Sequence, residues 1–401
     1  HFKKADSLLF NRREDSAIVY FNKALLIYEK NKNWERVAGC YNKIAESQWR
    51  NSYYNKFNQE NNLNESLENA KKALALCNSF LDKNTREEAN AYENIGDYYT
   101  TSKNSSIIAN HTPKDKNRIN IALKSYQKAL AIRQKILHKK HLDNAISYHK
   151  LGDVNNLLLK YVDALSYYKK ALSIKDKNLD GNTEIANVYL SIALLYRDKQ
   201  EYKLAIKYLH KALSIHSKQT SLNYRKIARI YRNFGQFYNK IGKYKKAIFY
   251  YKKCSSAMIK IYGNEYPYLH YILNSIGISF KNKGNYDKAL HYYMKALNAI
   301  DQIYRTKALT SDQNHTLNLD KSMIINNIAI IYKYQGAYDK VLQYLKKALY
   351  TNNIINGEIN ERSARNYNNI GVIYKLKEDY VQAIFYLNKA LNQRLQILNH
   401  Y

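Results

Sequence analysis

The residues best suited to covalent or metal chemistry are three cysteines, Cys40, Cys77 and Cys254, and 11 histidines. A cysteine beside a histidine can act as a nucleophile, and closely spaced cysteines and histidines can hold zinc. These cysteines are odd in number, lie far apart and form no CxxC pair, so they support neither a zinc site nor a disulfide framework. No GxxxxGK[ST], GxGxxG or HExxH motif occurs. The sequence therefore predicts a protein that is not an enzyme and binds no cofactor and no metal.

The charge of the chain is strongly positive, with 65 Lys and Arg against 33 Asp and Glu and a formal net charge of +32. Such a charge attracts nucleic acid and anionic membrane surfaces. Lys, Asn, Tyr and Ile are all abundant, a composition typical of an AT-rich genome, so codon bias is a second explanation of the charge. Hydrophobic residues make up 45% of the chain, too many for a disordered protein. No run of 18 apolar residues occurs, which predicts no membrane span.

The elements that must position any functional group are helices, because only two prolines and 12 glycines interrupt 401 residues. One segment type recurs with a period of 42 residues, lengthened at three places, and it contains many of the 41 tyrosines. In every copy the same early position holds a small residue. The nine small residues are Ala5, Ala45, Gly96, Gly152, Ala193, Gly235, Gly277, Ala329 and Gly371.

Each copy predicts a pair of helices. Tyr189, Ile192 and Tyr196 fall at helical spacing on one face, and Leu209 lies on the face of a following helix. Glycine or alanine at a helix crossing lets two backbones approach closely. One pair cannot bury its apolar face alone, so stacked pairs must build a continuous core. Cys254 occupies a small-residue position of a second helix, and we expect it to be buried and unreactive.

This pattern resembles the tetratricopeptide repeat. The 42-residue period exceeds the usual 34 residues and is similar to that of the kinesin-light-chain subtype, as are the loops at Tyr266-Pro267 and from His138 to Asp143. The resemblance implies an all-α, right-handed superhelical solenoid of about nine helical hairpins. Arrays of this subtype are found N-terminal to CHAT-type peptidase or kinase effector domains in bacterial proteins, which implies a role in regulating a neighbouring domain.

We expect residues 1–401 to form a single solenoid. Its units are predicted near 1–33, 34–83, 87–138, 142–178, 183–218, 225–262, 267–304, 319–354 and 361–398. Three insertions, at 51–62, 101–118 and 301–321, are polar and are predicted to be surface loops. Their extra length either has no function or allows one loop to contact a partner. Because the last segment lacks the polar cap that solenoids need, we expect the natural protein to continue past Tyr401.

The resemblance also implies a concave groove lined by one stripe of each first helix. Its predicted C-terminal part carries a basic ladder and an asparagine ladder, which suit carboxylates and an extended peptide backbone. The predicted groove residues are Arg197, Arg229, Arg232, Asn274, Lys281, Asn326, Lys333, Arg365, Asn368 and Lys375. The N-terminal part is predicted to be acidic, with Glu93, Asp97 and Asp153. The alternative is that these are ordinary solvated residues of a basic chain.

The sequence thus predicts a non-catalytic scaffold or sensor array that binds a partner protein or an extended, acidic peptide in its groove. A basic nucleic-acid-binding solenoid is the alternative function. Because no apolar signal core lies near His1, we expect a cytoplasmic location. The alternative is that a secretory signal upstream of His1 was cleaved, which would also explain why the chain starts at a histidine. The oligomeric state does not follow from the sequence.

Overall fold

The computed structural model describes residues 1–401 except 11–12, 55–58, 102–112, 175–178, 218–223, 264–268, 307–308, 310, 358 and 400–401. The described residues form 18 α-helices and no strand. The chain divides into two compact units, residues 1–219 and residues 220–401, and each is described by itself.

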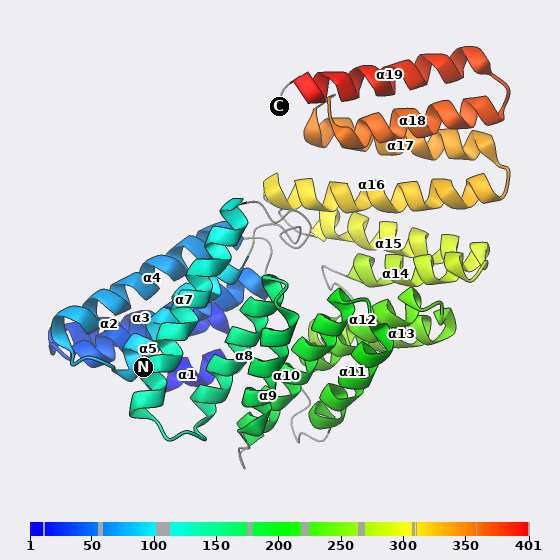
Figure 1. Ribbon diagram of the computed structural model, residues 1–401. Helices are drawn as coiled ribbons and strands as arrows, with labels where there is room; N and C mark the ends of the chain where they lie inside the picture. The colour runs from blue at the N-terminus through cyan, green and yellow to red at the C-terminus, as the bar shows by residue number, and fades with distance from the viewer. Residues whose placement is uncertain are drawn as a thin grey trace. The chain divides into compact units, whose positions relative to one another are not determined.

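The first unit consists of five helical hairpins (Figure 1). Its helices are α1 (Phe2–Phe10), α2 (Glu14–Lys30), α3 (Trp34–Tyr54), α4 (Gln59–Phe80), α5 (Arg86–Thr100), α7 (Pro113–Ile136), α8 (Leu142–Leu157), α9 (Tyr161–Ser173), α10 (Leu179–Asp198) and α11 (Tyr202–His216). Each hairpin also packs on the next, so buried residues of neighbouring hairpins share clusters, as Ala164 and Tyr168 of α9 do with Ile192 of α10.

The second unit contains four hairpins built in the same way (Figure 1). Its helices are α12 (Tyr224–Lys240), α13 (Tyr244–Tyr262), α14 (Leu269–Asn282), α15 (Tyr286–Thr306), α16 (Ser311–Tyr334), α17 (Tyr338–Asn356), α18 (Glu361–Leu376) and α19 (Tyr380–Asn399). The predicted all-α array of stacked helical hairpins is therefore confirmed. No helix in the described part of the chain is both long enough and apolar enough to cross a membrane.

In four hairpins the repeated small residue is a glycine because a tyrosine ring of the paired helix lies against it. A Cβ atom built on Gly277 would be 2.5 Å from the Tyr293 ring of the paired helix, and one on Gly152 would be 2.4 Å from the Tyr168 ring. Real Cβ contacts are essentially never shorter than 3.0 Å. The rings of Tyr168 and Tyr293 are buried in their cores, so glycine is required where they pack. The first hairpin instead carries Ala5 with Phe21, and a leucine takes the place of the ring in the hairpins of Ala193, Ala329 and Gly371.

A second aromatic contact joins the two helices near the turn in five hairpins. Residues 12 apart, one before and one after the turn, stack with ring centroids 5.4–5.6 Å apart and planes within 23°. These pairs are Tyr196–Tyr208, Tyr238–Tyr250, Phe280–Tyr292, Tyr332–Tyr344 and Tyr374–Tyr386. Many of the tyrosines thus have a structural use in the repeat, beyond any bias of composition.

The insertions are not the loops that their polar composition predicts. Helices α3 and α4 extend into 51–62, helices α15 and α16 occupy most of 301–321, and α7 begins at Pro113, within 101–118. Residues 102–112 of that last insertion lie outside the described residues. Apolar side chains at helical spacing outweigh the polar composition, because Leu63 and Leu317 are buried within the lengthened hairpins.

Candidate functional site

A cavity of about 490 Å³ lies in the second unit between α16, α17 and α18. Its apolar wall includes Ile330 of α16, Val341 and Leu345 of α17, and Ile373 of α18. Where α17 has Leu345, the second helices α13 and α15 carry Tyr251 and Tyr293, whose rings pack on glycine. We infer that the shorter leucine leaves the volume that a tyrosine ring occupies in those hairpins.

Helix α18 supplies much of the polar wall. Its start is set by an N-cap, because Asn360 Oδ1 accepts a hydrogen bond of 2.8 Å from the Ser363 backbone N–H. From that start, Arg365 and Asn366 follow Arg362 by three and four residues, so all three lie on one side of the helix and line the cavity. Helix α16 contributes Asn326 and Lys333 from the facing side, so the cavity is walled by amides and cations over an apolar base.

One buried donor in this wall lacks a hydrogen-bond partner among the described residues. The Asn366 side chain is only 2% exposed, and its Nδ2 makes no hydrogen bond among the described residues. A buried donor left unsatisfied costs about 1–3 kcal/mol. An acceptor oxygen placed in the cavity would remove that cost, which makes Asn366 a candidate contact for a ligand carbonyl or carboxylate.

The cations around the cavity keep their charge available. Arg365 is exposed and its Nε donates to Glu361 Oε1 at 3.3 Å on the same helix, a weak surface pair. Lys333 and Arg362 are exposed and form no ion pair within the described part of the chain. The region therefore presents positive charge beside an apolar space, an arrangement suited to a partner that carries both an apolar group and carboxylates.

Of the ten predicted groove residues, the cavity brings together three, namely Asn326, Lys333 and Arg365. Six others lie in the second unit but not in the cavity wall: Arg229, Arg232, Asn274, Lys281, Asn368 and Lys375. Arg197 belongs to the first unit, where its guanidinium contacts Asp198 Oδ1 at 2.7 Å. The composition of the stripe did not indicate Asn366 or Arg362. The one sequence signal at this hairpin was Val341, which lines the cavity. It stands where the second helices of other hairpins carry a small residue, namely Ala247, Ala289 or Ala383.

The expectation that Asn274 lines an open groove is wrong. Its side chain is 4% exposed, and its Oδ1 accepts a hydrogen bond of 3.0 Å from Asn327 Nδ2 in the next hairpin. Asn326 is half-buried and its Nδ2 donates to the Ser322 carbonyl of its own helix at 3.1 Å. Asparagines of this stripe thus join helices as well as facing solvent, because adjacent first helices approach closely enough for their amides to pair.

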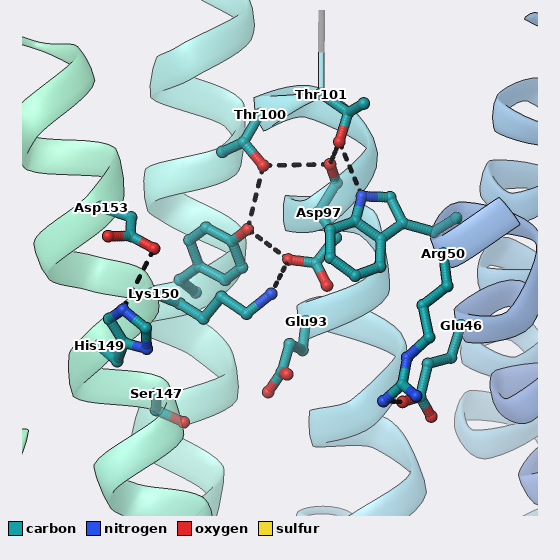
Figure 2. Close-up of polar contacts among 12 residues, drawn as sticks. Glu46, Arg50, Glu93, Asp97, Thr100, Thr101, Ser147, His149, Lys150 and Asp153 are labelled. Carbon is teal, nitrogen blue, oxygen red and sulfur yellow. Dashed lines mark hydrogen bonds and ion pairs between the residues drawn. The ribbon is translucent and has the colours of Figure 1, made fainter. Parts of the chain in front are cut away.

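The predicted acidic part of the groove is also corrected, because Asp97 and Glu93 are paired with cations in the first unit; Figure 2 shows the contacts of Asp97. Asp97 is 5% exposed and accepts hydrogen bonds from Lys150 Nζ at 2.5 Å and from Tyr126 Oη at 2.7 Å. Glu93 pairs with Arg133 of α7. Burial lowers the pKa of Lys150, but Asp97 and Glu93 outweigh it and raise that pKa above its usual value. Asp97 and Glu93 therefore offer no free acidic surface, whereas the Asp153 side chain is 42% exposed.

His149 lies beside this cluster in an arrangement that resembles a catalytic triad. Its Nδ1 is 2.5 Å from Glu184 Oε1, and its Nε2 is 2.8 Å from Ser191 Oγ. Asp153 Oδ2, however, also faces Nε2 at 3.5 Å (Figure 2). Burial opposes a charge on His149, but Asp153 and Glu184 raise its pKa, which favours imidazolium over a general base. Ser191 lies inside α10, whose backbone N–H groups bond within the helix. We therefore interpret the cluster as a structural tie between α8 and α10.

The thiols are buried as predicted for Cys254, and Cys40 and Cys77 are buried as well. Burial raises the pKa of Cys254 to about 12, so its thiol is protonated at neutral pH and a poor nucleophile. No cluster of three or more His, Cys, Asp or Glu suited to a metal ion occurs in the described residues. Low reactivity of the thiol remains a prediction.

Comparisons with known proteins agree with the repeat pattern. A family model for the tetratricopeptide repeat matches residues 116–177, 184–260, 226–302 and 320–396. A segment of 102 residues, 25% of the chain, is 33% identical to Protein KINESIN LIGHT CHAIN-RELATED 2 of Arabidopsis thaliana, and the match spans 15% of that relative's length.

Two solved structures share the fold over nearly the whole chain. The apo form of RapI has a TM-score of 0.59 and 16% identity, covering 99% of this chain and 97% of RapI. A Rap protein complexed with Competence and Sporulation Factor has a TM-score of 0.52 and 15% identity, covering 100% and 98% of the two chains. At these identities the likeness shows the fold alone.

Proposed function

Because this chain belongs to the tetratricopeptide repeat family, we propose that its second unit recognises an extended, acidic protein segment at the cavity between α16, α17 and α18. The observation that carries the proposal is the cavity itself, with an apolar base, cations at its edge and the unpartnered Asn366 amide in its wall. The coarser function, a protein-interaction scaffold, is what repeats of this family provide.

Each part of the cavity would take a different part of the segment. One apolar side chain would enter the space beside Leu345 and Ile373, where it would be removed from water. A backbone carbonyl would accept from Asn366 Nδ2 and so relieve its unmet hydrogen bond. Carboxylates on flanking residues would face Lys333, Arg362 and Arg365. Each exposed ion pair contributes only about 0.2–1 kcal/mol. The charges would therefore increase the association rate and orient the bound segment more than they would increase affinity.

Two relationships support the proposal without testing it. The Rap protein whose fold resembles this chain was solved in a complex with Competence and Sporulation Factor, so an array of this fold can hold a partner. The similarity to kinesin-light-chain-like arrays that precede effector domains extends the proposal, in that capture of a segment would regulate a domain carried by the same polypeptide.

The first experiment identifies a ligand and then reverses charge at the cavity. The full chain selects binders from a random peptide library, and fluorescence polarisation measures the affinity of the best acidic peptide. We expect Lys333→Glu/Arg365→Glu to weaken that affinity at least about tenfold, because two attractions become repulsions. Lys375→Glu is the control, since it changes an exposed lysine of the same helix that does not line the cavity. A chain that captures no acidic peptide, or a control that loses as much, would contradict the proposal.

The second experiment fills the cavity without disturbing the fold. Ala329→Gly/Leu345→Tyr installs in this hairpin the glycine and tyrosine pair that the chain already uses at Gly277 and Tyr293. We expect unchanged helix content and a loss of peptide binding of tenfold or more, because the tyrosine ring takes the space of the apolar anchor. Retained binding would show that the cavity is not the anchor site.

A further inference from the structure

The hairpin of α12 and α13 has no acidic residue. Residues 202–264 contain 15 Lys and Arg and not one Asp or Glu, although the chain as a whole has 33 acidic residues. Every other helical hairpin in the described part of the chain carries at least one carboxylate within its helices. A genome-wide bias toward lysine codons would enrich lysine everywhere and does not by itself remove acids from one hairpin.

The lysines of α13 share one face with a single exposed ring. Lys245, Lys246, Lys252, Lys253 and Lys260 are exposed, and Phe249 among them is 51% exposed. Spacings of three, four and seven residues place these side chains on the outer face of the helix. Its opposite face carries the buried Ala247, Tyr251, Cys254 and Met258. The outer face thus joins an exposed aromatic ring to five cations along about 22 Å of helix.

Aromatic rings, not carboxylates, contact three of these cations. Lys246 Nζ lies 5.5 Å from the centre of the Tyr238 ring, Lys253 Nζ lies 4.7 Å from that of Phe249, and Lys260 Nζ lies 5.2 Å from that of Tyr224. None of the five lysines forms an ion pair in the described part of the structure. A cation–π contact restrains an ammonium group and leaves its charge intact. The face is therefore a positive surface whose charges are partly preorganised.

We propose that the outer face of α13 binds the phosphate backbone of single-stranded nucleic acid. Successive phosphates would meet the lysines, and an unstacked base would lie on the face of the Phe249 ring opposite Lys253, the combination that single-strand binders use. A duplex would leave the ring unused, because its bases are already stacked. A helix that inserts into a lipid surface does so with its apolar face, and the apolar face of α13 is packed in the core. This surface is separate from the cavity of α16, α17 and α18.

The test measures binding of a fluorescein-labelled oligothymidylate to the full chain by fluorescence polarisation at several salt concentrations. Lys252→Glu/Lys253→Glu is expected to weaken binding at least about tenfold. It should also reduce the salt slope by about 1.4, because each phosphate contact in a single strand contributes about 0.7. Lys346→Glu/Lys347→Glu on α17 is the matched control, an exposed doublet at the same place in its repeat with the same change in charge. We expect it to bind nearly as well as the parent.

Phe249→Ala separates stacking from charge. We expect it to weaken single-strand binding roughly 5- to 150-fold, as loss of one stacked base does, and to leave the affinity for duplex of the same length unchanged. No binding by the parent, an equal loss in the α17 control, or no effect of Phe249→Ala would overturn the proposal. Binding to phosphatidylserine vesicles without binding to the oligonucleotide would overturn it in favour of a membrane. Lys333→Glu/Arg365→Glu should bind the oligonucleotide like the parent, which keeps this result independent of peptide recognition.

Discussion

Gly277 and Tyr293 permit a direct test of how the repeat is packed. In Gly277→Ala the new Cβ would lie 2.5 Å from Tyr293 Cε1 and 2.6 Å from Cδ1, about 1 Å closer than ordinary contact. The tyrosine ring is completely buried and cannot swing away. Overpacking of this kind costs about 1–3 kcal/mol, while alanine gains up to about 1 kcal/mol over glycine in a helix. We expect a net loss of about 1–2 kcal/mol in the free energy of unfolding.

The chain itself contains the compensating pair. Two hairpins carry Ala193 with Leu209 and Ala329 with Leu345 in the positions of Gly277 and Tyr293. We therefore expect Gly277→Ala/Tyr293→Leu to be more stable than the sum of the two single changes predicts, by about 1–2 kcal/mol. Gly39→Ala is the control, because its Cβ would lie 3.6 Å from the nearest Glu87 atom, an ordinary distance. That change should stabilise the protein by up to about 1 kcal/mol.

The assay is urea unfolding followed by two signals. Both tryptophans, Trp34 and Trp49, lie in the first unit, so their fluorescence reports that unit, whereas far-ultraviolet circular dichroism reports both. Changes at Gly277 should shift the circular dichroism transition with little effect on fluorescence, and Gly39→Ala should shift the fluorescence transition. The packing argument is refuted if Gly277→Ala unfolds like the parent, or if the double variant shows no recovery.

Two further predictions concern buried polar groups. Tyr168 Oη donates to Asp153 Oδ1 at 2.7 Å, whereas Tyr293 Oη has no partner among the described residues. Tyr168→Phe should thus cost about 1 kcal/mol in urea unfolding and Tyr293→Phe should cost nothing or stabilise; the reverse order would contradict the assigned contacts. The raised pKa of His149 gives stability that is complete below about pH 6.5 and is lost as pH rises through the folded-state value. Burial raises the pKa of Glu184, but His149 lowers it more strongly, to about 2. The stability that Glu184 contributes is therefore present above about pH 4.5 and lost in acid. Tryptophan fluorescence should therefore show the parent losing stability as the pH rises above about 6.5, and His149→Gln should flatten that slope; an unchanged slope would disprove the role of this pair.

Local spacing explains what the sequence could predict. The positions of Gly235, Gly277 and Gly371, followed by tyrosine and leucine at helical intervals, indicate paired helices and a small residue at each crossing, and the structure confirms both. These features depend on contacts within one helix or one hairpin, which lie close in sequence. The same reasoning failed for 301–321, because a polar average conceals the few buried positions that continue a helix.

The candidate sites depended on contacts between hairpins, and these only the tertiary structure decided. Asp97 meets Lys150 at a separation of 53 residues, and Asn274 meets Asn327 at the same separation. Whether such side chains meet each other or solvent depends on how each hairpin is rotated on the next, which the 42-residue period does not encode. The cavity arises likewise, because the volume beside Leu345 is set by three helices at once. The sequence by itself determined the repeated hairpin and its internal packing. The stacking of each hairpin on the next determined which polar groups are neutralised and which remain available to a partner.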